Sequence, residues 1–192
     1  THRRDLAEAG ESIDRFLHSG IAELGPKLGP IVWQFPTSRR FEAAAFETFL
    51  ARLPATVDGL ALRHVLDVRH DSFRSPAYLA LARRHQVATV FTDSDDYPSF
   101  ADITGPFVYA RIMRTDASLP RGISDEAASA VAACARLWRD GGEPQRLPRV
   151  EAPISSTVPR DVYLLFISGD KVKAPQAAMA VREQLDDAGS SD

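Results

Sequence analysis

The sequence predicts an α/β protein built around a parallel sheet. Five short apolar runs, rich in branched and aromatic residues, alternate with stretches whose apolar residues recur at helical spacing, an order typical of βα units. The glycine-rich turn of dinucleotide-binding folds and the phosphate loop of nucleotide hydrolases are both absent, which favours a barrel over an open doubly wound sheet. The 192 residues, 44% of them hydrophobic, suit a single domain.

In the first part of the chain the apolar pattern predicts alternating helices and strands. Residues 1–24 read as an amphipathic helix that a glycine and a proline end. Residues 31–35 form an almost continuous apolar run, as in a strand buried on both faces, and residues 41–53 predict the next helix. Residues 64–69 predict a second strand, after which Ser75 caps a helix that opens with proline.

The middle of the chain predicts two strands with little between them. Residues 88–93 and 107–113 have strand composition, but only a short segment rich in Asp, Ser and Pro separates them. The helix that should join these strands is therefore expected to be short or missing. Ser124 and two acidic residues then cap a well-marked amphipathic helix that ends at Gly141.

The last part of the chain predicts a loop and a final βα unit. Residues 142–161 hold four prolines and little periodicity, which indicates a long surface loop or a linker between domains, although too little chain follows for a second domain. Residues 162–168 predict the final strand, and residues 174–185 predict the final helix.

Charge and composition restrict the partners. The 26 acidic and 23 basic residues give a net charge of -3 and are mixed along the chain, so no basic stripe is available for nucleic acid. The apolar runs are too short to cross a membrane and no leader opens the chain, which predicts a cytoplasmic protein. We expect a small-molecule ligand instead.

Polar side chains stand at the ends of several predicted strands. Because side chains alternate across a strand, Asp67 and Arg69 are expected to face the barrel interior, and Tyr109 and Arg111 likewise. Asp93 follows Thr89 and Phe91 on the face assumed to point inward. The result is a predicted polar ring at the C-terminal strand ends, where barrel enzymes carry their sites, made of Gln34, Asp67, Arg69, Asp93, Tyr109 and Arg111.

This ring has two interpretations. The acidic and basic groups can satisfy one another in a buried ion-pair network. Alternatively, Arg69 and Arg111 bind an anionic or polyhydroxyl ligand while Asp67 or Asp93 acts as a base or metal ligand. His70, at the rim, is either a general base or metal ligand or a loop histidine bonded to the neighbouring aspartate or backbone.

Other chemistries find little support. A divalent metal is compatible with these side chains, but no spacing specifies one, and the acidic segment after Asp93 lacks the glycine and glutamate of a calcium loop. Cys134, the single cysteine, sits within a predicted helix away from the strand ends, so it is not expected to be a nucleophile. The remaining histidines, His64 among them, look like surface or helix-end residues.

Several blocks together resemble the YecE-like proteins, domain-of-unknown-function family 72 (DUF72). The blocks are LGPIVWQFP at residues 28–36, DVRH at 67–70, FVYAR at 107–111, VYLLF at 162–166 and APQAA at 174–178, in the order and spacing of that family. Together the blocks span nearly the whole chain.

The resemblance implies a TIM (β/α)8-type barrel, distantly similar to sugar isomerases, of which this chain holds about five of eight βα units. It also implies that Gln34, Arg69, His70, Asp93, Tyr109 and Arg111 line the family's site. About three further strands would precede Thr1, so we expect a broken barrel that aggregates or folds poorly alone. Asp67 stands where the family commonly has Glu, and Met113-Arg114 replaces a frequent His-Gly.

These observations lead to three hypotheses. The first is a sugar-isomerase-like or other enzyme acting on a carbohydrate or its phosphate, with Arg69 and Arg111 orienting the substrate and Asp67, His70 or Asp93 in proton or metal chemistry. The second is a non-catalytic barrel that binds a small molecule in the same ring. The third, a metal-dependent nuclease-like barrel, is disfavoured by the charge balance.

Overall fold

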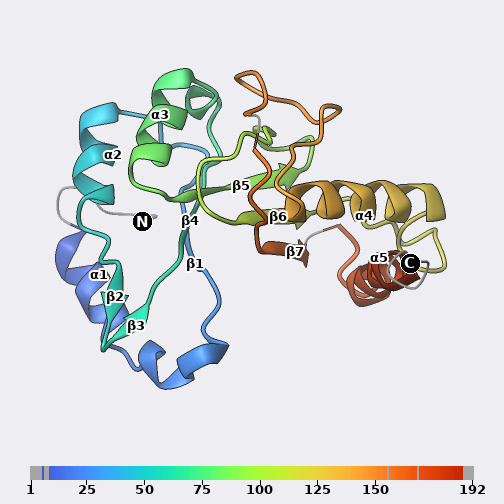
Figure 1. Ribbon diagram of the computed structural model, residues 1–192, viewed down its shortest axis with the longest axis horizontal. Coiled ribbons are helices and arrows are strands. Elements are labelled where there is room, and N and C mark those ends of the chain that lie inside the picture. Colours follow the sequence, from blue (N-terminus) through green and yellow to red (C-terminus); the bar gives the residue numbers. More distant parts are fainter. Residues whose placement is uncertain (1–5, 7–8, 155, 168, 188–192) are drawn as a thin grey trace.

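The protein has the predicted α/β class (Figure 1). A computed structural model describes residue 6 and residues 9–154, 156–167 and 169–187. Five parallel strands form a sheet in the order β1-β4-β5-β6-β7. They are β1 (Ile31–Gln34), β4 (His64–Asp67), β5 (Ala88–Asp93), β6 (Val108–Ile112) and β7 (Val162–Phe166). Within the described residues nothing pairs with the outer edges of β1 and β7, so the sheet is an open half-barrel, as expected.

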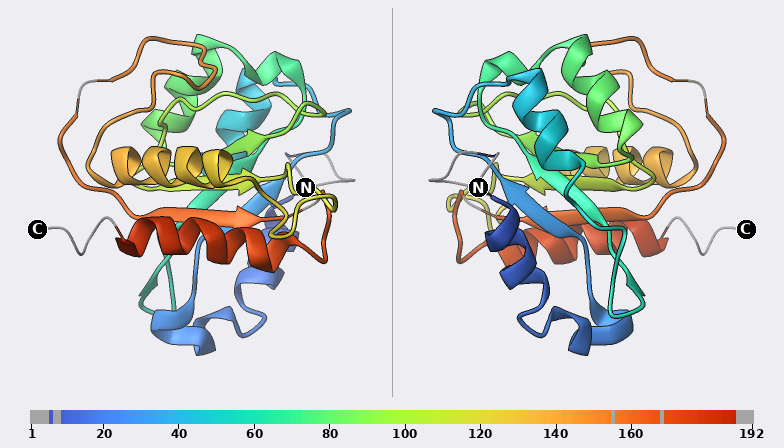
Figure 2. Two further views of the ribbon diagram at one scale, coloured as in Figure 1. Left: turned by 90° about the vertical axis from the view of Figure 1, so that its right-hand side faces the viewer. Right: turned by 90° about the vertical axis from the view of Figure 1, so that its left-hand side faces the viewer.

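Helices cover the convex face of the sheet (Figures 1 and 2). Helices α1, α2 and α3 pack over β1 and β4 through an aromatic core that includes Phe35, Phe46 and Tyr78. Helices α4 and α5 lie side by side over β7. The helical segments are α1 (Gly10–Leu17), η2 (Ile21–Lys27), α2 (Ala43–Leu50), η3 (Asp71–Phe73), α3 (Pro76–Arg84), α4 (Asp125–Arg139) and α5 (Ala174–Asp187). Among the residues that can be described, none of these is long and apolar enough to span a membrane.

Two local features of the fold differ from the sequence prediction. The helix predicted over residues 1–24 is interrupted: α1 ends at Leu17, and Gly20, with a φ of 96°, precedes a separate 3-10 segment, η2. Residues 1–5 and 7–8 of the predicted helix lie outside the described residues. A small hairpin, β2 (Thr56–Val57) with β3 (Leu60–Ala61), was not predicted at all. Its two-residue turn is Asp58-Gly59, with φ values of 48° and 78°, a sequence that favours such turns and that could have revealed the hairpin.

The helix caps and the missing helix agree with the sequence. The hydroxyl oxygens of Ser75 and Ser124 accept hydrogen bonds from the backbone N–H groups of Tyr78 and Ala127, at 3.3 and 3.2 Å. No helix is found in the connection from β5 to β6. This connection returns closely over the start of β5, where a Cβ on Gly105 would lie 2.6 Å from a backbone nitrogen.

The long loop before β7 is fixed on the β5–β6 connection. The buried carboxylate of Asp102 accepts hydrogen bonds from the backbone N–H groups of Val150 and Glu151, both at 2.9 Å. Within the loop, Glu143 forms a nearly fully buried ion pair with Arg149. The two connections therefore form one packed layer in the place where a helix is missing.

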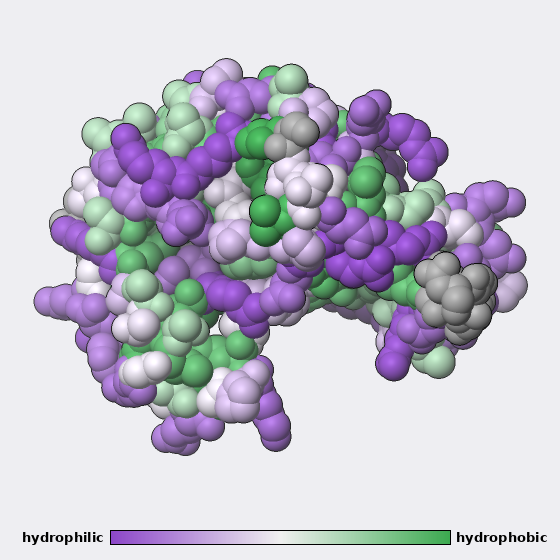
Figure 3. All heavy atoms as spheres, viewed as in Figure 1, coloured by the Kyte–Doolittle hydropathy of each residue, from purple (hydrophilic) through white to green (hydrophobic). Residues whose placement is uncertain are grey.

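The concave face of the sheet carries its own apolar cluster, which includes Val65, Val90 and Tyr109. At its edges Val32 and Leu165 are only partly buried. Figure 3 shows hydrophobic atoms along the hollow between the lobe of α1 and η2 and the helix α5. The partly buried apolar residues along these edges are the physical reason for the expected aggregation, which stays a prediction.

His64 is buried within the sheet, contrary to the surface or helix-end position predicted for it. Only 8% of the residue is exposed, and it lies on the convex side, where Trp33 Nε1 donates to its Nδ1 at 3.1 Å. Its Nε2 hydrogen-bonds the carbonyl oxygen of Pro54 at 2.8 Å. Since Nδ1 accepts, the ring is neutral with its proton on Nε2, and burial lowers the pKa of His64 below its ordinary value of 6.5.

This lowered pKa predicts acid destabilisation. Below pH 6.5 the unfolded chain binds a proton at His64 that the folded protein excludes, so stability present above pH 6.5 falls by at most about 1.4 kcal/mol per pH unit. We expect His64→Gln to remove this component of the urea-unfolding free energy between pH 7.5 and 5, and His85→Gln to keep it. Parallel pH profiles for wild type and His64→Gln would contradict the assignment.

Candidate functional site at the barrel mouth

The strand register brings the predicted polar residues together. Gln34 and Asp67 are paired positions at the ends of β1 and β4, so their side chains leave the sheet side by side. In β4, Val65 lies in the concave cluster whereas Leu66 lies in the convex core, which places Asp67 on the concave face as predicted. In β6, Tyr109 is concave and Ala110 convex, as also predicted.

One carboxylate holds two guanidinium groups at this end of the sheet. The Asp67 residue is 1% exposed, and its Oδ2 accepts from Arg69 Nη2 at 3.1 Å and from Arg111 Nη1. The Oε1 atom of Gln34 accepts from the same two nitrogens, at 3.0 Å and 3.2 Å. We call Gln34, Asp67, Arg69 and Arg111 the mouth cluster.

Aromatic residues border the mouth cluster. The ring of Tyr97, from the β5–β6 connection, lies 4.4 Å from the guanidinium carbon of Arg69. Tyr109 stacks on Tyr163 of β7, with ring centroids 6.2 Å apart. Burial raises the pKa of Tyr109 above its ordinary value of 10.0, an effect that the positive charge of Arg111 partly offsets, so the hydroxyl is neutral at physiological pH. Sequence reasoning missed Tyr97, because an aromatic residue in a polar loop carries no periodic signal.

The mouth cluster carries an excess of positive charge. Two guanidinium groups face one carboxylate, and both arginine side chains are largely buried, at 18% and 12% exposed. The Nε atom of Arg111 is buried and has no hydrogen-bond partner among the residues that the structure describes. A buried N–H donor of this kind costs about 1–3 kcal/mol when unpaired, which favours an added acceptor.

His70 is near this end of the sheet but is engaged with its own loop. Its Nδ1 accepts from the backbone N–H of Ser72 at 3.0 Å and lies 2.9 Å from the Ser72 hydroxyl. Thereby it caps the short η3 turn, and the neutral ring carries its proton on Nε2. This arrangement matches the alternative interpretation of His70 as a loop histidine.

Asp93 does not belong to the mouth cluster, and the prediction that it points inward was wrong. In β5 it is Val90 that lies in the concave cluster, whereas Phe91 packs on the convex side against Trp138 of α4. Asp93 shares the side of Phe91 and pairs with Arg114 at 2.8 Å. The strand is apolar on both faces, so its composition could not set the direction of the alternation.

Metal ligands do not cluster in the described part of the chain. No group of three or more His, Cys, Asp or Glu side chains there could hold an ion together. The acidic segment Asp93 to Asp96 is instead tied to Arg114, which bridges Asp93 and Asp95.

The fold and the mouth cluster define half of a (β/α) barrel with a charged site at the C-terminal strand ends. The chain belongs to the family described as "Protein of unknown function DUF72", whose model matches residues 1–191. The resemblance drawn from the sequence blocks is thereby confirmed. No curated protein matches the sequence.

Solved structures of the same family have the same fold. A DUF72 family protein from Enterococcus faecalis V583 superposes with a TM-score of 0.65 at 16% identity, covering 94% of this chain and 70% of that protein. A second crystal structure of it gives a TM-score of 0.64 at 15% identity, covering 94% and 67%. A DUF72 family protein from Thermotoga maritima MSB8 gives 0.62 at 18% identity, covering 99% and 70%. The chain thus spans about 70% of the length of these relatives.

The mouth cluster predicts an unusually costly substitution. Asp67→Asn removes the negative charge between two largely buried guanidinium groups, and we expect a loss of about 3–5 kcal/mol in unfolding free energy, measured by urea denaturation. The matched control, Asp93→Asn, breaks a more exposed pair and should cost about 1 kcal/mol or less. Equal and small losses in both variants would show that the cluster does not depend on Asp67.

Proposed function

We propose that the barrel mouth binds a small anionic ligand, a phosphorylated or carboxylated carbohydrate, between Arg69 and Arg111. The observation that carries this proposal is the uncompensated positive charge of the mouth cluster, in which one carboxylate serves two guanidinium groups. A bound anion neutralises this charge, and its oxygen atoms accept hydrogen bonds from the guanidinium N–H groups that Asp67 and Gln34 do not engage.

The cluster is preorganised for such a ligand. Asp67 and Gln34 fix both guanidinium groups through hydrogen bonds, and the Tyr97 ring packs on the face of Arg69. Side chains that are already ordered lose little conformational entropy when the ligand binds. The neutral hydroxyl of Tyr109, near the charge of Arg111, adds a group suited to a sugar hydroxyl.

Binding without catalysis is the function that this geometry supports best. Asp67 is paired with two arginines, His70 directs Nδ1 to Ser72, and Asp93 lies on the other face of the sheet. A general base must reach the proton that it takes, and none of these three groups is arranged for that in the mouth cluster. The sugar-isomerase-like activity implied by the family resemblance stays a prediction.

Calorimetric titration with glucose 6-phosphate, inorganic phosphate and glucose tests this proposal. We expect the two phosphates to bind and glucose to bind much more weakly. Arg111→Gln should weaken phosphate binding by about 10- to 100-fold, because a charge-assisted hydrogen bond contributes about 1.5–3 kcal/mol.

Arg114→Gln is the matched control, because Arg114 follows the same strand but pairs with Asp93 and Asp95 on the convex side. It should leave phosphate binding unchanged. Thermal unfolding of both variants verifies that they are folded. Phosphate binding that survives Arg111→Gln in a folded protein, or that responds equally to both substitutions, would overturn the proposal.

A further inference from the structure

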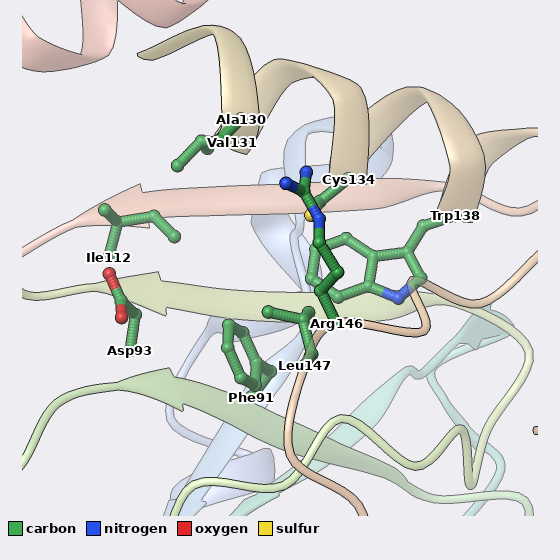
Figure 4. A pocket seen from close by; sticks show the side chains of 9 residues that line it. All are labelled: Phe91, Asp93, Ile112, Ala130, Val131, Cys134, Trp138, Arg146 and Leu147. Carbon is green, nitrogen blue, oxygen red and sulfur yellow. The ribbon is translucent and has the colours of Figure 1, made fainter. Parts of the chain in front are cut away.

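A cavity on the convex side of the sheet lies apart from the barrel mouth (Figure 4). Its volume is about 280 Å³, and it lies between β5, β6 and α4. The walls are mainly apolar, with Phe91, Ile112 and Trp138 among them. The rest of the apolar lining comes from Ala130, Val131, Cys134 and Leu147.

The missing helix explains why this cavity exists. In a regular βα repeat a helix follows each strand and covers its convex side chains. Here the β5–β6 connection and the long loop before β7 take that place, and they contribute Ala101, Ile103 and Leu147 to the core around Trp138. They leave the convex side chains Phe91 and Ile112 lining an open space. The cavity lies over inner strands of the sheet, not over its edge strands β1 and β7.

The cavity also has a defined electrostatic character. Asp93 lies at one end beside Ile112, and its carboxylate is engaged by Arg114. The guanidinium of Arg146 lies beside Cys134, away from Asp93 (Figure 4). Throughout the described ranges, no carboxylate forms an ion pair with Arg146. The available charge at the cavity is therefore positive.

We propose that this cavity is a binding site for a small aromatic carboxylate, with its ring system between Phe91, Val131 and Trp138 and its carboxylate on Arg146. An apolar cavity of about 150 Å³ accommodates one benzene ring, so 280 Å³ has room for a bicyclic ring system. The apolar walls supply the affinity, and Arg146 selects for the acid. This site differs from the barrel mouth in its face of the sheet, its residues and its apolar ligand.

The experiment compares 2-naphthoate with 2-naphthylmethanol, which has the same ring system without the charge. Affinities are measured by calorimetry, and occupancy of the cavity is read from the alkylation rate of Cys134, the only cysteine in the chain. We expect both probes to slow alkylation and naphthoate to bind about fivefold more tightly, as suits an exposed ion pair.

Variants localise the binding. Arg146→Gln should remove the preference for naphthoate and leave the alcohol unchanged, whereas Arg139→Gln, an exposed arginine of α4 paired with Asp140, should change neither. Ala130→Phe should fill the cavity and abolish both. Arg111→Gln should have no effect on naphthoate, which separates this site from the barrel mouth.

Three results would overturn the proposal. They are the absence of protection of Cys134 by either probe, an unchanged naphthoate preference in Arg146→Gln, and naphthoate binding that Arg111→Gln abolishes. If Ala130→Phe fails to fold, the comparison of the two probes in Arg146→Gln decides alone.

Discussion

The bridge from Asp67 to Arg69 and Arg111 is the interaction on which the mouth of this half-barrel depends. Two guanidinium groups that are both largely buried repel each other, and removing either from water costs several kcal/mol unless a counter-charge is near. Asp67 supplies that charge from β4, which lies between β5 and β1, the strand that carries Gln34. The contacts of this one carboxylate therefore depend both on the register of β1 with β4 and on the sheet curvature that brings β6 close to β4.

The same bridge determines what the site can do. A carboxylate held by two arginines acts as a positioning group, and it leaves the cluster with a surplus positive charge that an anion can neutralise. Stability and ligand binding thus have a common origin. The network interpretation and the ligand interpretation, which are alternatives at the level of sequence, describe one arrangement.

Much of this arrangement could be predicted from the sequence. Side chains alternate between the two faces of a strand, and a polar residue in an otherwise apolar strand shows which of its residues face away from the helices. Asp67 in β4, Arg69 just after it, and Arg111 in β6 have to avoid the helix-covered face, and this fixes the direction of their neighbours. In β5 every residue before Asp93 fits either face. Thr89 faces the convex side, where Tyr78 and Thr104 hydrogen-bond its hydroxyl, and Asp93 follows it there.

Features that arise from contacts between distant segments were beyond prediction. Tyr97 reaches Arg69, and Asp102 fixes Val150 and Glu151, only because the helix between β5 and β6 is replaced by two interacting loops. The sequence indicated that this helix is short or missing, but not which loop would take its place. The cavity beside Trp138 is a consequence of that replacement.

The most direct test of the account is the arginine side-chain Nε–H signal of Arg111 in a 1H–15N correlation spectrum during titration with inorganic phosphate. The signal is assigned by its loss in Arg111→Lys. Since this N–H is buried and has no partner among the described residues, we expect a saturable shift much larger than those of exposed arginines such as Arg139. A shift no larger than theirs would contradict the proposal that the surplus charge beside Asp67 forms an anion site.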